Sequence, residues 1–272
     1  MHDFHQKVVL ITGASTGIGR AAAIAFRQAG ARVALAARSA DALVQLADVL
    51  GGPDWALAIP TDVSDPDQCE RFVAESVAHF GYIDVLVNNA GMVVSGLFEK
   101  LEPGDAERQF QINFFGALYC TRAALPHLKA RRGVIVNVSS VAGLIGTPTT
   151  SVYSASKAAM NAWARALRVE LRPFGVDVVT VCPYFTSGVQ LAQKGIIREG
   201  SLHNRPGKTR RAPGTQTAEE AAQAILRAAA RRPRLLVLSW AGRAIWRLDR
   251  LAPWLVDWVM EWGMQRLHKG ET

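Results

Sequence analysis

Two side chains that could exchange protons with a substrate, Tyr153 and Lys157, lie four residues apart in an alanine-rich segment without glycine or proline. Such a segment favours an α-helix, and residues at i and i+4 share one helix face. An ammonium group beside a phenol favours the phenolate, so we expect Lys157 to lower the pKa of Tyr153 from its ordinary value of about 10. A general acid or base works best when its pKa lies near the operating pH. The pair could therefore transfer protons at neutral pH.

A serine hydroxyl, Ser140, is expected to lie near this pair. It follows Val134–Val138, an apolar run typical of a buried parallel strand. Ligand sites of open parallel sheets lie beyond the carboxyl ends of the strands, where Ser140 and the tyrosine helix should meet. Because a Tyr-x-x-x-Lys pair also occurs in ordinary helices, its interpretation depends on the elements that position it.

The chain begins with a strand, a glycine-rich turn and a helix. Lys7–Thr12 is a β-branched run, glycines follow at 13, 17 and 19, and Arg20–Ala29 has helical composition. Glycines in such a turn let the backbone approach a pyrophosphate, which rests on the helix N-terminus. This arrangement is typical of the first part of a dinucleotide-binding unit, although a glycine-rich turn can also simply connect two elements.

An arginine follows the second expected strand, Arg32–Ala37. An acid near this point would bind the ribose 2′-hydroxyl of NAD, whereas Arg38 could accommodate the 2′-phosphate of NADP. The sequence therefore favours NADP(H). A surface arginine without a ligand is the alternative.

Apolar runs and helical segments continue to alternate along the chain. The expected strands are Ala56–Pro60, Ile83–Val87, Val176–Val181 and Leu235–Leu238, and the expected helices are Ala40–Leu50, Asp65–Phe80, Glu107–His127 and Thr217–Ala230. Thr217 and Glu220 form a capping box at the start of the last helix. The alternation predicts an α/β fold of the Rossmann type, with a doubly wound parallel sheet.

Polar residues lie at the ends of two strands and within one helix. Asp62 could accept a hydrogen bond from the adenine amino group or serve as a helix N-cap. Asn88–Gly91 suits a tight turn beside a cofactor. Asn113 lies inside an expected helix, where asparagine is disfavoured, so a packing or functional reason is expected.

The composition excludes some classes of function. The chain has 272 residues, a mean hydropathy of +0.09 and a formal net charge of +8, which suits one large α/β domain. Residues 194–211 hold six lysines and arginines against one acid. A basic flap over an anionic cofactor or near a membrane, or a solvated loop, explains this run better than general nucleic-acid binding.

The cysteines and the N-terminus indicate the cellular environment. Cys69, Cys120 and Cys182 lack metal-ligand spacing and histidine partners, so we expect buried thiols and no metal site. The N-terminus enters a strand directly, without the features of a signal or transit peptide. We expect a cytoplasmic protein, with peripheral membrane contact as an open alternative.

Taken in order, these motifs resemble those of the short-chain dehydrogenase/reductase family. The resemblance covers about residues 5–190 and rests on Thr12-Gly13-x-x-x-Gly17-Ile18-Gly19, Asp62-Val63, Asn88-Asn89-Ala90-Gly91, Asn113, Ser140, Tyr153-x-x-x-Lys157 and Pro183. It implies that Tyr153 is the general acid/base and that Ser140 orients the substrate oxygen. Lys157 would lower the pKa of the tyrosine and bind the nicotinamide ribose, and Asn113 would hold a water that links Lys157 to solvent.

The resemblance also implies a set of cofactor contacts and an oligomer. The contacts are expected from Gly13, Ser15, Thr16, Gly17, Ile18, Gly19, Arg38, Asp62, Val63, Asn89, Ala90, Gly91, Tyr153, Lys157, Pro183 and Thr186. A homodimer or homotetramer would form through the helices that hold Asn113 and Tyr153. One position departs from the family pattern, because Tyr184 replaces the glycine that usually follows the proline and Thr186 comes early. Tyr184 could instead line the substrate pocket.

The C-terminal third is divided into a substrate lid at 188–214, the end of the nucleotide-binding domain at 238, and a helical extension at 239–272. The extension holds five of the seven tryptophans, and Trp254, Trp258 and Trp262 follow an i, i+4, i+8 row. This helix could pack on the core or on another subunit, or lie in the plane of a membrane surface. The absence of a long uncharged run disfavours a transmembrane span.

The sequence therefore predicts an NADP(H)-dependent enzyme that interconverts a ketone or aldehyde and an alcohol on a hydrophobic substrate, such as a steroid, retinoid or long-chain ketone. Reduction of a 3-oxoacyl thioester is the nearest alternative, because the basic run could meet a phosphopantetheine carrier. A catalytically silent NADP-binding sensor is the alternative from another class.

Overall fold

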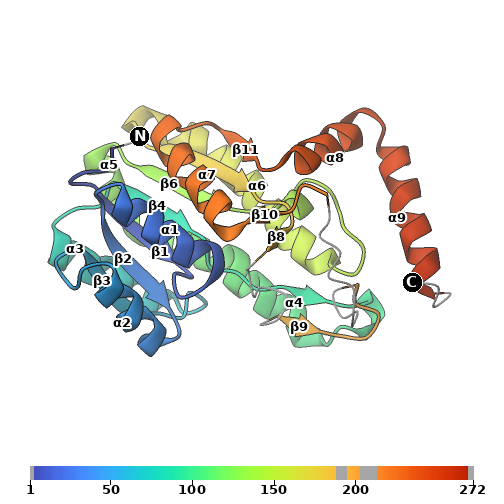
Figure 1. Ribbon diagram of the computed structural model, residues 1–272, viewed down its shortest axis with the longest axis horizontal. Helices are drawn as coiled ribbons and strands as arrows, with labels where there is room; N and C mark the ends of the chain where they lie inside the picture. The colour runs from blue at the N-terminus through green and yellow to red at the C-terminus, as the bar shows by residue number, and fades with distance from the viewer. Residues whose placement is uncertain (1–2, 188–194, 203–212, 269–272) are drawn as a thin grey trace.

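The computed structural model describes residues 3–187, 195–202 and 213–268. Its centre is a sheet of seven parallel strands in the order β11-β7-β6-β4-β1-β2-β3 (Figure 1). The strands are β1 Val8–Thr12, β2 Arg32–Ala37, β3 Ala56–Pro60, β4 Val85–Asn88, β6 Val134–Val138, β7 Asp177–Cys182 and β11 Leu235–Val237. The strand order reverses between β1 and β4, and such a switch point is where open α/β sheets bind ligands.

The apolar strands are buried on both faces of the sheet by two layers of helices. Helices α1 Gly17–Gln28, α2 Ala40–Val49 and α7 Ala218–Arg231 cover one face, and α3 Pro66–Phe80, α5 Gly116–Arg131 and α6 Ser151–Leu171 cover the other (Figure 1). Phe26 and Ile225 are fully buried in the first layer, and Phe72 and Leu128 in the second. Because parallel strands between two such layers have no solvated face, they read as continuous apolar runs. The predicted doubly wound sheet is confirmed.

Most expected elements are confirmed with bounds that shift by no more than one helical turn. The exception is the single helix expected at Glu107–His127, which was wrong. Helix α4 Pro103–Phe110 leads into a π-helical segment, Gln111–Phe115, before α5 begins at Gly116. Apolar periodicity does not reveal a local change from i→i+4 to i→i+5 hydrogen bonding, and such π segments occur frequently at functional sites.

Two short parallel pairs lie outside the main sheet and were not expected. Strand β5 Val94–Ser95 pairs with β9 Ile196–Ile197, and β8 Thr186–Ser187 pairs with β10 Gln216–Thr217. Strands β8 and β10 flank the expected lid at 188–214, and β9 lies within it. The lysines and arginines at 194, 205, 208, 210 and 211 lie outside the described residues.

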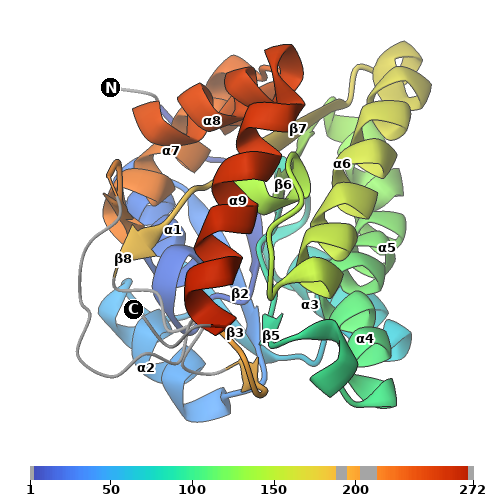
Figure 2. The same cartoon turned by 90° about the vertical axis from the view of Figure 1, so that its right-hand side faces the viewer.

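The C-terminal extension consists of two helices, α8 Trp240–Leu251 and α9 Pro253–His268. Helix α9 runs alongside the carboxyl ends of the strands and projects beyond the sheet and its helix layers (Figures 1 and 2). In the described part of the chain, no helix combines the length and the apolar composition that crossing a bilayer demands. The proposed boundary at residue 238 stays a prediction.

Candidate active site

The glycine-rich turn after β1 is bound to the end of β4. Asn89 donates hydrogen bonds from its side-chain amide to the carbonyl oxygens of Thr12 and Gly13, at 2.9 and 3.2 Å. The Thr12 hydroxyl accepts from the backbone N–H groups of Asn89 and Ala90, both at 3.0 Å. These bonds join the two strand ends that the sequence assigned to the cofactor.

The residues of this turn fit a dinucleotide. Gly13 and Gly17 have positive φ angles of 67° and 56°, which glycine adopts at little cost. A Cβ atom on Gly19 would collide with the carbonyl oxygen of Gly13. The N-cap Thr16 makes no side-chain hydrogen bond to the first turn of α1. The backbone N–H groups of that turn can therefore bind a phosphate. Ser15, Thr16 and Gly17 line a cavity of about 440 Å³ between α1 and α7.

The residues expected around the adenosine lie at the ends of β2 and β3. Arg38 follows β2 directly and is exposed. Asp62 accepts hydrogen bonds from the backbone and the hydroxyl of Ser64, at 3.0 and 2.7 Å. Asp65, and not Asp62, is the N-cap of α3, so the N-cap alternative for Asp62 was wrong. Val63 is buried against Gly116 of α5.

Ser140 and Tyr153 lie together beyond the carboxyl end of β6. Ser140 accepts a hydrogen bond from the backbone N–H of Ala142 at 3.1 Å, which fixes its position at the start of a short 3-10 turn. Burial raises the pKa of Tyr153, and a hydrogen bond with the Ser140 side chain opposes this rise. The net direction is the opposite of the lowering that the sequence led us to expect.

Burial also determines the pKa shift of Lys157. Its side chain is buried, and its ammonium group donates a hydrogen bond to the carbonyl oxygen of Val138 at 2.9 Å. Burial lowers the pKa of Lys157 to about 8, against a smaller opposing effect of Cys182. Loss of solvation therefore dominates at both groups, because it disfavours the phenolate and the ammonium alike. The three cysteines are buried free thiols, as expected.

Asn113 lies in the π-helical segment and is fully buried. Its Oδ1 accepts from the backbone N–H of Met92 at 2.8 Å, and its Nδ2 donates to the Met92 carbonyl oxygen and to the Ser156 hydroxyl, both at 3.0 Å. A Cβ atom on Gly91 would lie 3.3 Å from Asn113 Oδ1 and 3.6 Å from Lys157 Nζ. The packing reason expected for a mid-helix asparagine is thus a bridge from the end of β4 to the helix of Tyr153 and Lys157.

The segment after β7 is shaped by its unusual tyrosine. Pro183 accepts a hydrogen bond from the backbone of Val141 at 2.9 Å. Tyr184 packs against α8, where a Cβ atom on Gly242 would lie 3.2 Å from the Tyr184 Cβ. The Thr186 hydroxyl donates to the Tyr184 carbonyl oxygen at 3.1 Å. Tyr184 thus joins the helical extension to the body of the protein.

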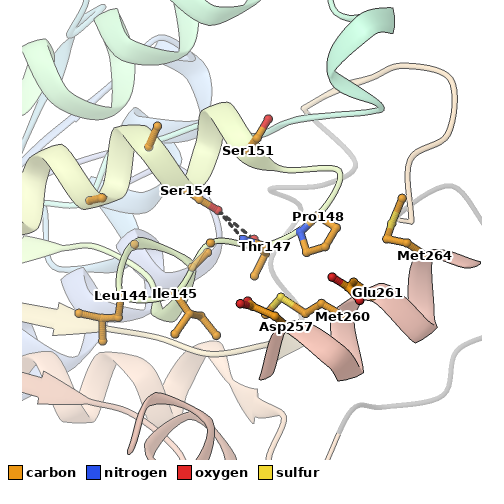
Figure 3. Close-up of a pocket in the computed structure, with 15 residues that line it drawn as sticks. Leu144, Ile145, Thr147, Pro148, Ser151, Ser154, Asp257, Met260, Glu261 and Met264 are labelled. Atoms are coloured by element: carbon orange, nitrogen blue, oxygen red, sulfur yellow. Dashed lines mark hydrogen bonds between the residues drawn. The ribbon is translucent and has the colours of Figure 1, made fainter. Parts of the chain in front are cut away.

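A cavity of about 640 Å³ lies between α9 and the loop that connects Ser140 to α6 (Figure 3). Leu144, Ile145 and Pro148 line it from the loop, and Asp257, Met260, Glu261 and Met264 line it from α9. The residues that we expected to be catalytic, and Tyr184, are not among its lining. Sequence reasoning missed the contribution of α9, although the i, i+3, i+4, i+7 spacing of its four lining residues is a signal for one helix face.

Arg198, the arginine of the basic run that the structure describes, is held by acids. Its guanidinium group contacts Glu102 at 2.7 Å and the largely buried Asp105 at 2.9 Å. These contacts hold the pKa of Asp105 below its ordinary value. Arg198 therefore secures the start of α4 to β9, which weakens the argument that the basic run meets a phosphopantetheine carrier.

The chain matches known proteins over most of its length. The sequence profile described as short chain dehydrogenase matches residues 7–196. An 11-beta-hydroxysteroid dehydrogenase-like protein of Arabidopsis thaliana is 43% identical over 185 residues, which are 66% of this chain and 59% of that protein. The chain thus spans less than two thirds of the length of the curated relatives it matches first.

Two solved structures share the fold. A short chain dehydrogenase/reductase from Burkholderia phymatum in complex with NAD has a TM-score of 0.80 and 27% identity, over 94% of this chain and 96% of that one. An alcohol dehydrogenase from the archaeon Thermococcus sibiricus, complexed with 5-hydroxy-NADP, has a TM-score of 0.74 and 28% identity, over 86% of this chain and 96% of that one.

Proposed function

Because this chain belongs to the short-chain dehydrogenase/reductase family, we propose that it is an NAD(P)-dependent oxidoreductase that acts on CH–OH groups. In the finer form of the proposal, it uses NADP(H) and interconverts a ketone and an alcohol on a hydrophobic, hydroxysteroid-like substrate. Tyr153 is the general acid/base, and Ser140, Lys157 and Asn113 support it.

The observation that carries the proposal is the meeting of Ser140, Tyr153 and Lys157 beyond the end of β6. The Ser140 side chain lies near enough to the phenol of Tyr153 to oppose the rise in pKa that burial causes, and Lys157 is anchored on Val138, the last residue of the same strand. The glycine-rich turn fits the pyrophosphate at the adjacent switch point. Proton-transfer groups thus lie where a nicotinamide ring would be expected when the dinucleotide rests on α1.

In the direction of reduction, the hydroxyl of Ser140 orients the substrate carbonyl, and the phenol of Tyr153 donates its proton to the carbonyl oxygen as the alcohol forms. The bound cofactor supplies the hydride. Lys157, whose ammonium group is anchored on the carbonyl oxygen of Val138, would bind the nicotinamide ribose, as the resemblance to the family implies. Asn113 positions the end of β4 against α6. In the reverse direction the phenolate accepts the proton from the alcohol.

The preference for NADP(H) rests on Arg38. This side chain is exposed at the carboxyl end of β2, the place from which a side chain can reach the 2′ position of the adenosine ribose. The ion pairs found in the described part of the chain do not include Arg38. Family membership alone leaves the choice open, since the two solved relatives are in complex with NAD and with an NADP derivative.

The names of the matched relatives support a hydroxysteroid-like substrate. The segment beside Ser140 agrees with a large apolar molecule, because Leu144, Ile145 and Tyr184 form one apolar cluster with Trp246 and Met260 from the C-terminal helices. The expected cytoplasmic location and the homo-oligomer stay predictions.

A panel of carbonyl substrates tests this proposal. Purified protein should oxidise NADPH with a steroid ketone or a polycyclic ketone and show little activity with an acetoacetyl thioester, as followed by absorbance of the reduced nicotinamide. Activity confined to the thioester would favour the 3-oxoacyl reductase alternative. NADPH binding without turnover across the whole panel would favour the silent sensor.

A further inference from the structure

Helix α8 presents two different rows of side chains to solvent. Arg243, Arg247 and Arg250 form one exposed row, and Trp240, Leu248 and Leu251 belong to the row beside it. The residues turned toward the protein include Gly242 and Asp249, which are buried and partly buried. A helix with an arginine row beside a tryptophan and leucine row is typical of segments that lie in the interface of a membrane.

Helix α9 continues the apolar row. Trp254, Trp258 and Trp262 lie on one face at i, i+4 and i+8, with exposed fractions of 69%, 60% and 48%. Val259 is also exposed, whereas Val256 is buried against the body. Leu251 is 86% exposed and is only three residues from Trp254, so the apolar rows of α8 and α9 meet at the turn between the helices.

The acidic residues of α9 lie along one edge of the tryptophan row. Asp257 and Glu261 line the cavity between α9 and the loop before α6 (Figure 3), together with Met260 and Met264. On a helix with 3.6 residues per turn, this set is centred roughly 110° away from the tryptophan row. Asp257 and Glu261 are themselves exposed and border the tryptophan row on the side of the cavity, with Glu261 roughly 60° from the centre of the row.

We propose that these exposed rows of α8 and α9 dock the protein on the surface of an anionic lipid bilayer. We call the surface the C-terminal docking face, and it consists of Trp240, Arg243, Arg247, Leu248, Arg250, Leu251, Trp254, Trp258, Val259 and Trp262. The tryptophan rings lie at the level of the headgroups. There the apolar part of each ring contacts acyl chains, and its N–H group donates a hydrogen bond to water or a headgroup. The arginines contact anionic phosphates.

Charge favours lipid over a second copy of the chain as the occupant of this face. A symmetric dimer through the same surface would bring the arginine row of each protomer into one interface. Asp249, the one acid of α8, is partly buried and points away from that row. An anionic membrane surface instead supplies the opposite charge along the whole row.

Co-sedimentation of the full chain with lipid vesicles tests the proposal. The protein should sediment with vesicles that contain about one third phosphatidylserine in phosphatidylcholine, and bind vesicles of phosphatidylcholine alone at least tenfold more weakly. The triple variant Trp254→Gln, Trp258→Gln, Trp262→Gln should lose at least tenfold in partition. The double variant Arg247→Gln, Arg250→Gln should lose at least fivefold, and only for the anionic vesicles.

Matched controls use the same residue types far from α8 and α9. Trp55→Gln precedes β3 and is 37% exposed, and Arg122→Gln is exposed on α5; both should bind vesicles like the wild type. Circular dichroism and NADPH binding report whether each variant is folded. A measurement that needs no variant is quenching of tryptophan emission by vesicles with brominated acyl chains, which the proposal requires.

Two outcomes would overturn the proposal. One is equal vesicle binding by the wild type and a folded triple tryptophan variant. The other is a wild-type protein that binds none of the vesicles but forms a dimer. In that case the tryptophan substitutions would dissociate the dimer, as measured by light scattering. The latter result would assign the face to a second copy of the chain. Neither outcome depends on turnover, so the proposed activity is tested separately.

Discussion

The ammonium group of Lys157 donates a hydrogen bond to the carbonyl oxygen of Val138 at 2.9 Å, which anchors α6 on the last residue of β6. This bond keeps a positive charge inside the protein, where only 3% of the residue is exposed. The cost of burying the charge appears as a lowered pKa of about 8. Lys157 is therefore a residue that the fold retains at an energetic cost, which is expected of a functional group.

The pH dependence of stability measures this cost. Lysine in an unfolded chain has a pKa near 10.5, above the value of about 8 in the folded protein. Between these values the unfolded state holds more protons, so the free energy of unfolding rises with pH. Below this window both states are protonated and the penalty, on the order of 3 kcal/mol, is fully present.

Urea unfolding of the wild type and of Lys157→Met, from about pH 7 to about pH 10, should isolate this effect. The free energy of unfolding of the wild type, minus that of the variant, should rise across this range by on the order of 2 kcal/mol. A difference that stays constant with pH would show that Lys157 titrates as an ordinary exposed lysine.

Removal of the Tyr153 hydroxyl should abolish turnover and spare cofactor binding. Tyr153→Phe keeps the ring and loses the proton donor, so kcat should fall by ~10²–10⁴-fold. NADPH binding, measured by fluorescence, should change little. Tyr119→Phe is the control, because Tyr119 stacks on Phe115, with 6.2 Å between the ring centroids, and is not expected to act in catalysis. Full activity of Tyr153→Phe would refute the assigned role.

The sequence predicted the sheet, the two helix layers and the positions of Ser140, Tyr153 and Lys157. Apolar runs and glycine spacing report local geometry, and parallel strands bring their carboxyl ends to one edge. The direction of the pKa shift of Tyr153 was not predictable in this way. Spacing shows that Lys157 shares a helix face with the tyrosine, but the loss of solvation depends on the burial produced by the whole fold.

The sequence did not predict the π-helical segment or the α9 side of the cavity beside the loop before α6, and the reasons are related. The five residues Gln111–Phe115 have the same apolar pattern that an α-helix would have. The bonds of Asn113 to Met92 and Ser156 join residues that are distant in the sequence, so no local pattern predicts them. The helical nature of α9 was foreseen from its tryptophans. Its methionine face against the loop before α6 depends on the path of α8, which no local pattern specifies.

Exchange of the charge at position 38 should change cofactor preference. Arg38→Glu places a carboxylate where we propose that the 2′-phosphate of NADP binds. The kcat/KM for NADPH should fall at least tenfold, about 1.4 kcal/mol, whereas that for NADH should stay within about threefold or improve. Arg122→Glu, at an exposed arginine on α5, controls for the same change in net charge. An equal loss with both cofactors would indicate a structural effect and contradict the NADP assignment.

Tyr184 is predicted to hold the C-terminal helices against the body of the protein. Its ring packs in one apolar cluster with Ile145, Trp246 and Met260, and Gly242 leaves the space into which it fits. Tyr184→Gly should therefore cost about 2–4 kcal/mol of unfolding free energy, because a large apolar side chain is lost from a packed site.

The same variant should also loosen α8 without changing the sheet. Hydrogen exchange of the amides of 240–251 should accelerate in Tyr184→Gly, while the amides of β1 and β4 keep their protection. Phe185→Gly is the matched control, because this neighbouring aromatic residue is 52% exposed and should cost far less. Equal effects of the two substitutions on stability and on exchange in α8 would mean that Tyr184 does not secure the extension, since the loss of either aromatic ring next to β8 would then be equivalent.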